Sequence, residues 1–422
     1  MRNLTVLILA LSMGQVAAQT NVSGGIFSDV TWTLANSPYH VMDDLVVFET
    51  ATLTIEPGVE VRVASTKGIE LRNGRLRAVG TAEQPISFSG LNSQWDGFLV
   101  RGVLLAWDDT NQVQMEHCRG SHAVVFMNLD EANHTPYNFI DCEFTNNQQA
   151  FYGASGWFAP GRFNFERCMF QNNDWALGDA DFYTVTECTF MENGVAVSGA
   201  NRVTGCTFLD NELALRPYGL TDGNTFTGNT IAVDGGWNNE NNRFTNNTVV
   251  GNGIGIRMGT FFDTVQFVGN RICDNTVWNI ERVAGAVNTA NLAGNCFCTD
   301  DADAIESTIL HAMDNLALGL VLVEPFIGDP DCAGLVTAVP EATSMEWSIH
   351  PNPTADGFTL TLPTEFGTGT LDLFDATGRK VRSVLLTGPT TYADVTDLPN
   401  GMLQAVLHNA HGVTTRAVVV MH

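Results

Sequence analysis

The residues best suited to bind a ligand are aromatic and charged side chains that follow the same repeated small residue in successive segments. They are Tyr152, Asp179, Asp181, Arg216, Tyr218, Asp234, Trp237 and Arg257. Aromatic rings stack on the apolar faces of sugars, while acids and arginines hydrogen-bond to hydroxyl groups. The pattern predicts a glycan-binding strip. The alternative is that these are unrelated residues on variable loops, because polar residues occur anywhere outside a core.

Catalytic residues are less evident than binding residues. Glycoside hydrolases need two facing carboxylates, and polysaccharide lyases need a base beside a group that neutralises the uronate. The only lysines are Lys67 and Lys380, so no lysine base is available in the repeated region. We therefore expect non-catalytic binding of a glycan or another surface. The alternative is a polysaccharide lyase or glycoside hydrolase acting on an acidic polysaccharide.

Acidic residues dominate the charge of the chain. Lys and Arg total 20 against 46 Asp and Glu, a formal net charge of −26, which excludes nucleic acid as a partner because its phosphates would be repelled. Ca²⁺ could bind to oxygens of Asp179 and Asp181, or of Asp300, Asp301 and Asp303. The second group is better explained as the acidic start of a helix. No other cofactor is indicated.

One short motif recurs along the chain and must position the candidate binding residues. It reads Cys-x-Phe-x-x-Asn-x-x-Ala and is followed by an aliphatic residue. Its copies begin at Cys142, Cys168, Cys188, Cys206 and Asn224, with a sixth at Asn242. Cys and Phe two residues apart lie on one face of a strand, and a unit of roughly 18 to 26 residues with such strands is typical of a solenoid. Stacked coils predict a column of phenylalanines and a ladder of amides. The predicted ladder contains Asn147, Asn173, Asn193, Asn211, Asn229 and Asn247.

The N-terminal residues predict export. Residues 1–18 have a basic start, an apolar stretch and small residues before Gln19, which is typical of a cleaved secretory signal. No later segment is apolar for long enough to span a membrane.

The order of turns and strands from Leu53 to Phe98 resembles the N-terminal coils of bacterial surface β-helix proteins. Residues 294–326 resemble their last coil, in which a short helix closes the solenoid. The resemblance covers roughly residues 30–330. It implies an all-β, right-handed, single-stranded parallel β-helix of the pectate-lyase-like type over residues 19–335, with a capping helix near 300–313. The Asn-Thr-Asp, Gly-Asp-Asp, Gly-His-Gly and Arg-Ile-Lys motifs of the pectin hydrolases with this fold do not occur in the sequence.

Cysteines fall into two groups. Those at the repeated position predict a column of buried thiols, although disulfides between adjacent coils stay open as an alternative. Cys296, Cys298 and Cys332 cluster near the expected cap, and a Cys298–Cys332 disulfide is predicted there. A zinc site is disfavoured because no fourth ligand accompanies these three.

A separate module follows a linker at residues 336–345. Alternating strands over 346–422 predict a small antiparallel, Ig-like β-sandwich. Its motif order resembles the type A C-terminal sorting domain of type IX secretion cargo. The matching residues are Pro351, Asn352, Pro353, Asp375, Gly378, Arg379 and Gly401. The resemblance implies a Bacteroidota-type bacterium, the type IX secretion machinery as partner, and a secreted protein that is extracellular or attached to the outer-membrane surface.

Overall fold

The computed structural model describes the chain as two compact units, residues 1–335 and 336–422. The described residues are 19–101, 112–129, 137–153, 163–178, 183–237, 242–261, 265–332, 347–362, 369–374, 380–386, 388, 390–398, 400–409 and 412–421. The predicted signal and the predicted linker both lie outside them. No helix in the described part of the chain has the length and apolar character needed to cross a membrane.

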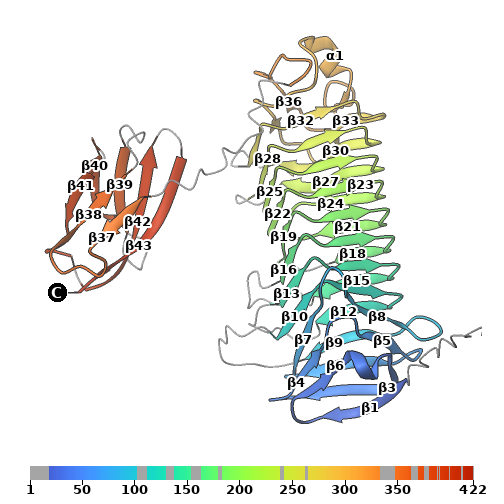
Figure 1. Cartoon of the computed structure of the whole chain (residues 1–422). Helices are drawn as coiled ribbons and strands as arrows, with labels where there is room; N and C mark the ends of the chain where they lie inside the picture. The colour runs from blue at the N-terminus through green and yellow to red at the C-terminus, as the bar shows by residue number, and fades with distance from the viewer. Residues whose placement is uncertain are drawn as a thin grey trace, which may run out of the picture. The chain divides into compact units, whose positions relative to one another are not determined.

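The first unit is a solenoid of parallel strands stacked coil on coil (Figure 1). Most coils contribute three strands, one to each of three faces, which we call face 1, face 2 and face 3. Face 1 is an 11-stranded parallel sheet among the described residues. Its strands are β2 (Val30–Trp32), β4 (Thr52–Ile55), β7 (Arg75–Val79), β10 (Val113–Glu116), β13 (Tyr137–Ile140), β16 (Phe163–Glu166), β19 (Tyr183–Thr186), β22 (Arg202–Thr204), β25 (Leu220–Asp222), β28 (Arg243–Thr245) and β31 (Gln266–Val268).

Faces 2 and 3 are joined at the N-terminal end, because β1 (Thr20–Ile26) pairs with β3 (Tyr39–Phe48), which pairs with both β5 and β6. Face 2 contains β5 (Glu60–Val63), β8 (Ile86–Gly90), β11 (Cys118–Ser121), β14 (Glu143–Thr145), β17 (Met169–Gln171), β20 (Thr189–Met191), β23 (Thr207–Leu209), β26 (Thr225–Thr227), β29 (Thr248–Val250) and β32 (Arg271–Cys273). Face 3 contains β6 (Gly68–Arg72), β9 (Gly97–Arg101), β12 (Val125–Leu129), β15 (Gln149–Gly153), β18 (Trp175–Gly178), β21 (Val195–Ser198), β24 (Leu213–Arg216), β27 (Ile231–Trp237), β30 (Ile254–Phe261), β33 (Trp278–Arg282) and β35 (Ile309–Leu310).

Single left-handed residues make the corners on either side of face 2. In the coil of β17, Arg167 has φ 51° and Asn172 has φ 54°, and glycines serve the first corner in later coils, as at Gly205 with φ 64°. Glycine and asparagine adopt this conformation at little cost. At the second corner the left-handed residue precedes an inward-pointing Asn, as Asn172 precedes the buried Asn173.

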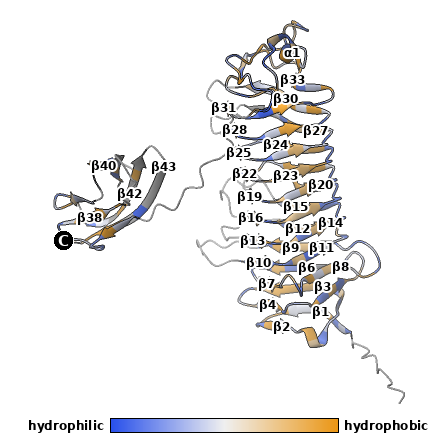
Figure 2. Ribbon diagram, turned by 45° about the horizontal axis from the view of Figure 1, so that its top comes forward, coloured by the Kyte–Doolittle hydropathy of each residue, from blue (hydrophilic) through white to orange (hydrophobic). Residues whose placement is uncertain are grey.

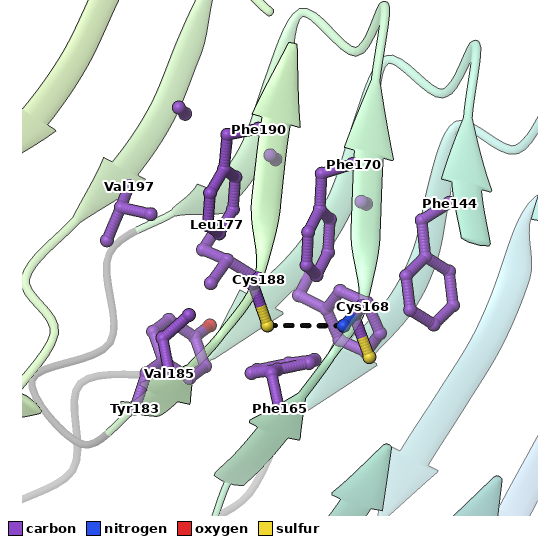
Figure 3. Packing of buried hydrophobic residues seen from close by; sticks show 14 of the residues in the cluster. Phe144, Phe165, Cys168, Phe170, Leu177, Tyr183, Val185, Cys188, Phe190 and Val197 are labelled. Carbon is purple, nitrogen blue, oxygen red and sulfur yellow. Dashed lines mark hydrogen bonds between the residues drawn. The ribbon is translucent and has the colours of Figure 1, made fainter. Parts of the chain in front are cut away.

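The predicted phenylalanine column is present inside the solenoid (Figure 3). Phe170, Phe190, Phe208 and Phe226 stack with centroid separations of 4.8, 4.9 and 4.6 Å. These rings are fully buried, and apolar positions recur along the strands of successive coils (Figure 2). Burial of each ring stabilises the fold by about 1.5 to 3 kcal/mol, so the column is a major source of stability.

The predicted amide ladder is also present, with one change of register. Asn147, Asn173, Asn193, Asn211 and Asn229 are linked coil to coil, but Asn229 then bonds to Asn252 rather than Asn247. The assignment of the sixth motif copy was therefore wrong. Its Phe244 lies in β28 on face 1, opposite Thr221.

A second column runs beside the first at the other corner of face 2. Its N-terminal part contains the thiols of Cys118, Cys142, Cys168, Cys188 and Cys206. Its C-terminal part contains the amides of Asn224, Asn247, Asn270 and Asn295. The two parts meet where the backbone N–H of Cys206 donates to Asn224 Oδ1 at 2.8 Å. The cysteines are therefore reduced and buried, and no disulfide joins adjacent coils in this column.

Short elements close the C-terminal end of the solenoid. They include β34 (Ala290–Asn291), α1 (Ala302–Glu306) and β36 (Val321–Leu322), and η1 (Leu34–Asn36) lies near the other end of the unit. The helix is shorter than the predicted 300–313 segment. Asp301 caps it by accepting hydrogen bonds from the backbone N–H groups of Asp303 and Ala304. The side chain of Ile305 is buried in the core.

The second unit has two antiparallel sheets with one shared core. One sheet contains β37 (Ser348–His350), β38 (Gly357–Thr361) and β41 (Thr390–Asp394). The other contains β39 (Gly369–Phe374), β40 (Lys380–Leu386), β42 (Gly401–Asn409) and β43 (Gly412–Val420). The predicted fold class, a parallel β-helix followed by a small antiparallel β domain, is confirmed.

Candidate functional site

The interior columns offer no reactive group to a ligand. The five thiols of the second column are buried, and burial raises the pKa of Cys142 and Cys168 well above the ordinary value. Burial also acts to raise the pKa of Cys188, but hydrogen bonds from Cys168 and Cys206 lower it overall. All five thiols are enclosed in the core, so none of them can be reached by a ligand. A binding or catalytic site must therefore be sought on the outer surface of the faces.

Four residues of the predicted strip, Tyr152, Arg216, Asp234 and Arg257, lie on strands of face 3, whereas Tyr218 lies in the connection between β24 and β25. The residues pair in register from coil to coil, with Tyr152 opposite Gly178, Ser198 opposite Arg216, and Asp234 opposite Arg257. Trp237 is the last residue of β27. Asp179 and Asp181 lie outside the described residues, so the predicted calcium ligands there are not placed.

One cation of the strip is paired with an acid, and another lies over an aromatic ring. Arg257 Nε donates to Glu281 Oε2 at 2.7 Å, and the guanidinium of Arg216 lies 5.7 Å from the ring centre of Trp175. Tyr152 and Tyr218 are each 39% exposed. Two aromatic rings are thus open to solvent, while the Arg257 cation already has an acidic partner.

The hollow on this surface lies on the N-terminal coils of face 3 and was not predicted. It is a groove of about 590 Å³ over β3, β6, β9 and β12. Its floor includes Val46, Glu70, Leu99 and Asn128, which pair in register, and the next residue in that column is Tyr152. The predicted strip therefore begins one coil beyond the groove.

Acidic groups predominate around the groove. Glu70 is bound by Arg72 through two hydrogen bonds of 2.7 and 2.8 Å, and this contact raises the pKa of Arg72. Asp44 lies within β3, and Asp96 immediately precedes β9. Leu99 and Val124 add apolar surface. Such a mixture of apolar floor and polar rim suits a small ring with hydroxyl groups.

No metal centre is formed by the residues that the structure describes. They contain no group of three or more His, Cys, Asp or Glu side chains arranged to hold a metal ion. Of the acids near the cap, Asp301 is engaged as the N-cap of α1, as the sequence had suggested for this group.

The predicted Cys298–Cys332 disulfide is wrong. Cys298 pairs with Cys273, and Cys332 pairs with Cys296. Cys298 Sγ and Cys332 Sγ are nevertheless 3.6 Å apart, because the four cysteines form one cluster. Cys273 was missed since it occupies the end of β32, where no repeat motif marks it.

The first predicted sorting motif, from Pro351 to Pro353, lies in the connection between β37 and β38. Asn352 Oδ1, between two prolines, accepts a hydrogen bond from the backbone N–H of Val419 at 2.9 Å. Gly401 begins β42 and pairs with Val420. The opening motif and the last strand are thus joined. Asp375, Gly378 and Arg379 lie outside the described residues.

Two comparisons with known proteins bear on these features. Residues 348–421 match the family model described as a secretion system C-terminal sorting domain. Protein bark beetle of Drosophila melanogaster is 45% identical over 84 residues, which is 20% of this chain and 3% of the fly protein. The chain therefore corresponds to only a small part of that protein's length.

The family match and the sorting motifs agree on residues that form one compact unit. Domains of this kind mark cargo of the type IX machinery, which moves proteins across the outer membrane. The chain is a secreted protein that carries a type IX secretion system C-terminal sorting domain behind a parallel β-helix.

Proposed function

We propose that the β-helix binds a glycan through the outer side of face 3, with the groove as the principal site. The observation that carries the proposal is the continuity of one column. It runs from Glu70, Leu99 and Asn128 in the groove to the exposed ring of Tyr152. Aromatic stacking beside hydrogen-bonding groups is a usual means of sugar recognition.

Export supports this location for a binding surface. The second unit directs the chain across the outer membrane, where polysaccharides and surface glycans are the abundant ligands. We further propose that residues 1–18 are the signal for the first step across the inner membrane, on the composition given above.

The test uses the purified secreted protein on a glycan array. Binding should be lost when Tyr152 is replaced by Ala. Tyr218→Ala is the matched control, because both tyrosines are 39% exposed, but Tyr218 lies in the connection between β24 and β25, several coils beyond the groove. Failure to bind any glycan, or equal losses for the two variants, would contradict the groove as the site.

A second candidate is a polysaccharide-degrading enzyme. The observation that favours it is the presence of Asp44, Glu70 and Asp96 in one groove, since glycoside hydrolases act through two carboxylates. Glu70 is held by Arg72, and Asp44 Oδ2 lies 3.5 Å from Lys67 Nζ, which leaves Asp96 as the acid without an ion pair. Release of soluble oligosaccharides from polysaccharides, abolished by Asp96→Asn, would favour the enzyme over the binding protein.

A further inference from the structure

We infer that the ligand of the groove is a glycan that carries free amino groups, rather than a uronate or sulfated glycan. This inference rests on the proposed function and names the ligand class of the same site. It is drawn from the charges that line the groove, from which of them are already paired, and from the hydrogen bonding of the strands beneath.

The cations near the groove are already paired. Arg72, the one base among the lining residues, donates twice to Glu70. Lys67 lies just before β6, and its Nζ is 2.6 Å from Asp43 Oδ1 and 3.5 Å from Asp44 Oδ2. An acidic sugar would have to displace one of these carboxylates from its partner before it could bind either cation.

One carboxylate in the groove is open. Asp96 is exposed, and among the described residues no hydrogen bond or ion pair reaches its side chain. An ionised carboxylate only accepts hydrogen bonds, so its natural partners are ammonium and hydroxyl groups. Glu70 is paired with Arg72, and Asp44 lies beside Lys67, so the unpaired charge among the lining residues is the negative charge of Asp96, which attracts cations.

The strands beneath the groove disfavour a basic peptide as the occupant. An extended peptide usually binds to a sheet by adding a strand at a free edge. β9 pairs with β6 on one side and with β12 on the other, so it offers no free edge. The groove therefore offers no strand edge to a peptide, which suits a sugar chain better than a polypeptide.

The experiment compares three oligosaccharides of equal length with the purified secreted protein by isothermal titration calorimetry. They are an oligomer of glucosamine, its N-acetylated form and an oligomer of a uronic acid. The glucosamine oligomer should bind most tightly, and its affinity should fall as salt is raised, because exposed charges are screened. Asp96→Asn should weaken this binding about fivefold, which corresponds to about 1 kcal/mol for a solvent-exposed charge pair.

Asp300→Asn is the matched control, since Asp300 is an exposed acid near the cap helix. Equal or tighter binding of the uronate oligomer would overturn the inference and leave glycan binding intact. Equal effects of Asp96→Asn and Asp300→Asn on the affinity for the glucosamine oligomer would also overturn the inference. Binding of a lysine-rich peptide at the groove, without any binding of the glucosamine oligomer, would overturn it as well. Absence of binding to every glycan on the array would instead remove the proposed function itself.

Discussion

Replacement of Asn211 by Ala would test whether the amide ladder stabilises the solenoid. The Asn211 side chain takes part in four hydrogen bonds. Its Nδ2 donates to Phe190 O at 3.1 Å and to Asn229 Oδ1 at 2.9 Å. Its Oδ1 accepts from the backbone N–H and from Nδ2 of Asn193, both at 3.0 Å. All of these groups are buried, so the substitution leaves polar partners without water or protein to bond.

At about 1 kcal/mol for each bond, the free energy of unfolding should fall by about 4 kcal/mol. Urea unfolding followed by tryptophan fluorescence measures this change, because only Trp347 of the 8 tryptophans lies in the second unit. Asn92→Ala is the control, since Asn92 is exposed and its side chain has no hydrogen bond among the described residues. A loss below about 1 kcal/mol for Asn211→Ala would refute the ladder as a source of stability.

Four further outcomes follow from the first unit. Phe190→Ala should lower the free energy of unfolding by about 3 to 5 kcal/mol in the same urea experiment, because the ring is fully buried between two others. Cys206→Asn should lower the free energy of unfolding by less than about 1 kcal/mol, because Asn224 already occupies the equivalent position in the next coil. A larger decrease would mean that amides cannot replace thiols in this column. The hydrogen bond from Arg167 holds the pKa of Asp141 below 3.8, so this pair stabilises the fold above the unfolded pKa and the contribution is lost as pH falls through the folded pKa. Arg167→Gln should therefore lower the free energy of unfolding by up to about 1 kcal/mol at pH 7 and by less near pH 3. A difference in urea midpoint between this variant and the unchanged protein that does not vary with pH would argue against the ion pair. Alkylation of the native, unreduced protein should label none of the 9 cysteines, whereas denaturation without reductant should expose the five free thiols, as intact-mass measurement can count.

The coil architecture could be predicted because its inward positions tolerate few residue types. Cys, Phe and Asn recur there at fixed spacing, and each has a partner in the next coil. The sixth copy was misplaced because Asn242-x-Phe244 imitates the motif on face 1. The true continuation keeps the spacing of the two amides, from Asn224 and Asn229 to Asn247 and Asn252, and replaces Phe by Val249. Two asparagines five residues apart were the better signal.

The groove could not be found from the sequence. Its lining residues come from four coils between Asp44 and Asn128, before the regular motif begins, and no spacing relates them. The pairing of cysteines at the cap was equally hidden, since Cys298 lies close to both Cys273 and Cys332. The strip was predicted from the repeat register. The ion pair between Arg257 and Glu281 could not be predicted in this way, because the coil that holds Glu281 lacks the motif.

The five free thiols between Cys118 and Cys206 bear on when the solenoid must fold during export. Secreted chains pass through compartments in which enzymes oxidise any thiol they reach. The chain contains both these five thiols and the four cysteines of the cap, and the native pairing uses only the latter. The coils from β11 to β23 must therefore close before an oxidant reaches them, while the cap must stay accessible until its two bonds have formed. The order in which the two ends of the solenoid fold thus bears on the native pairing, separately from the stability of the finished structure.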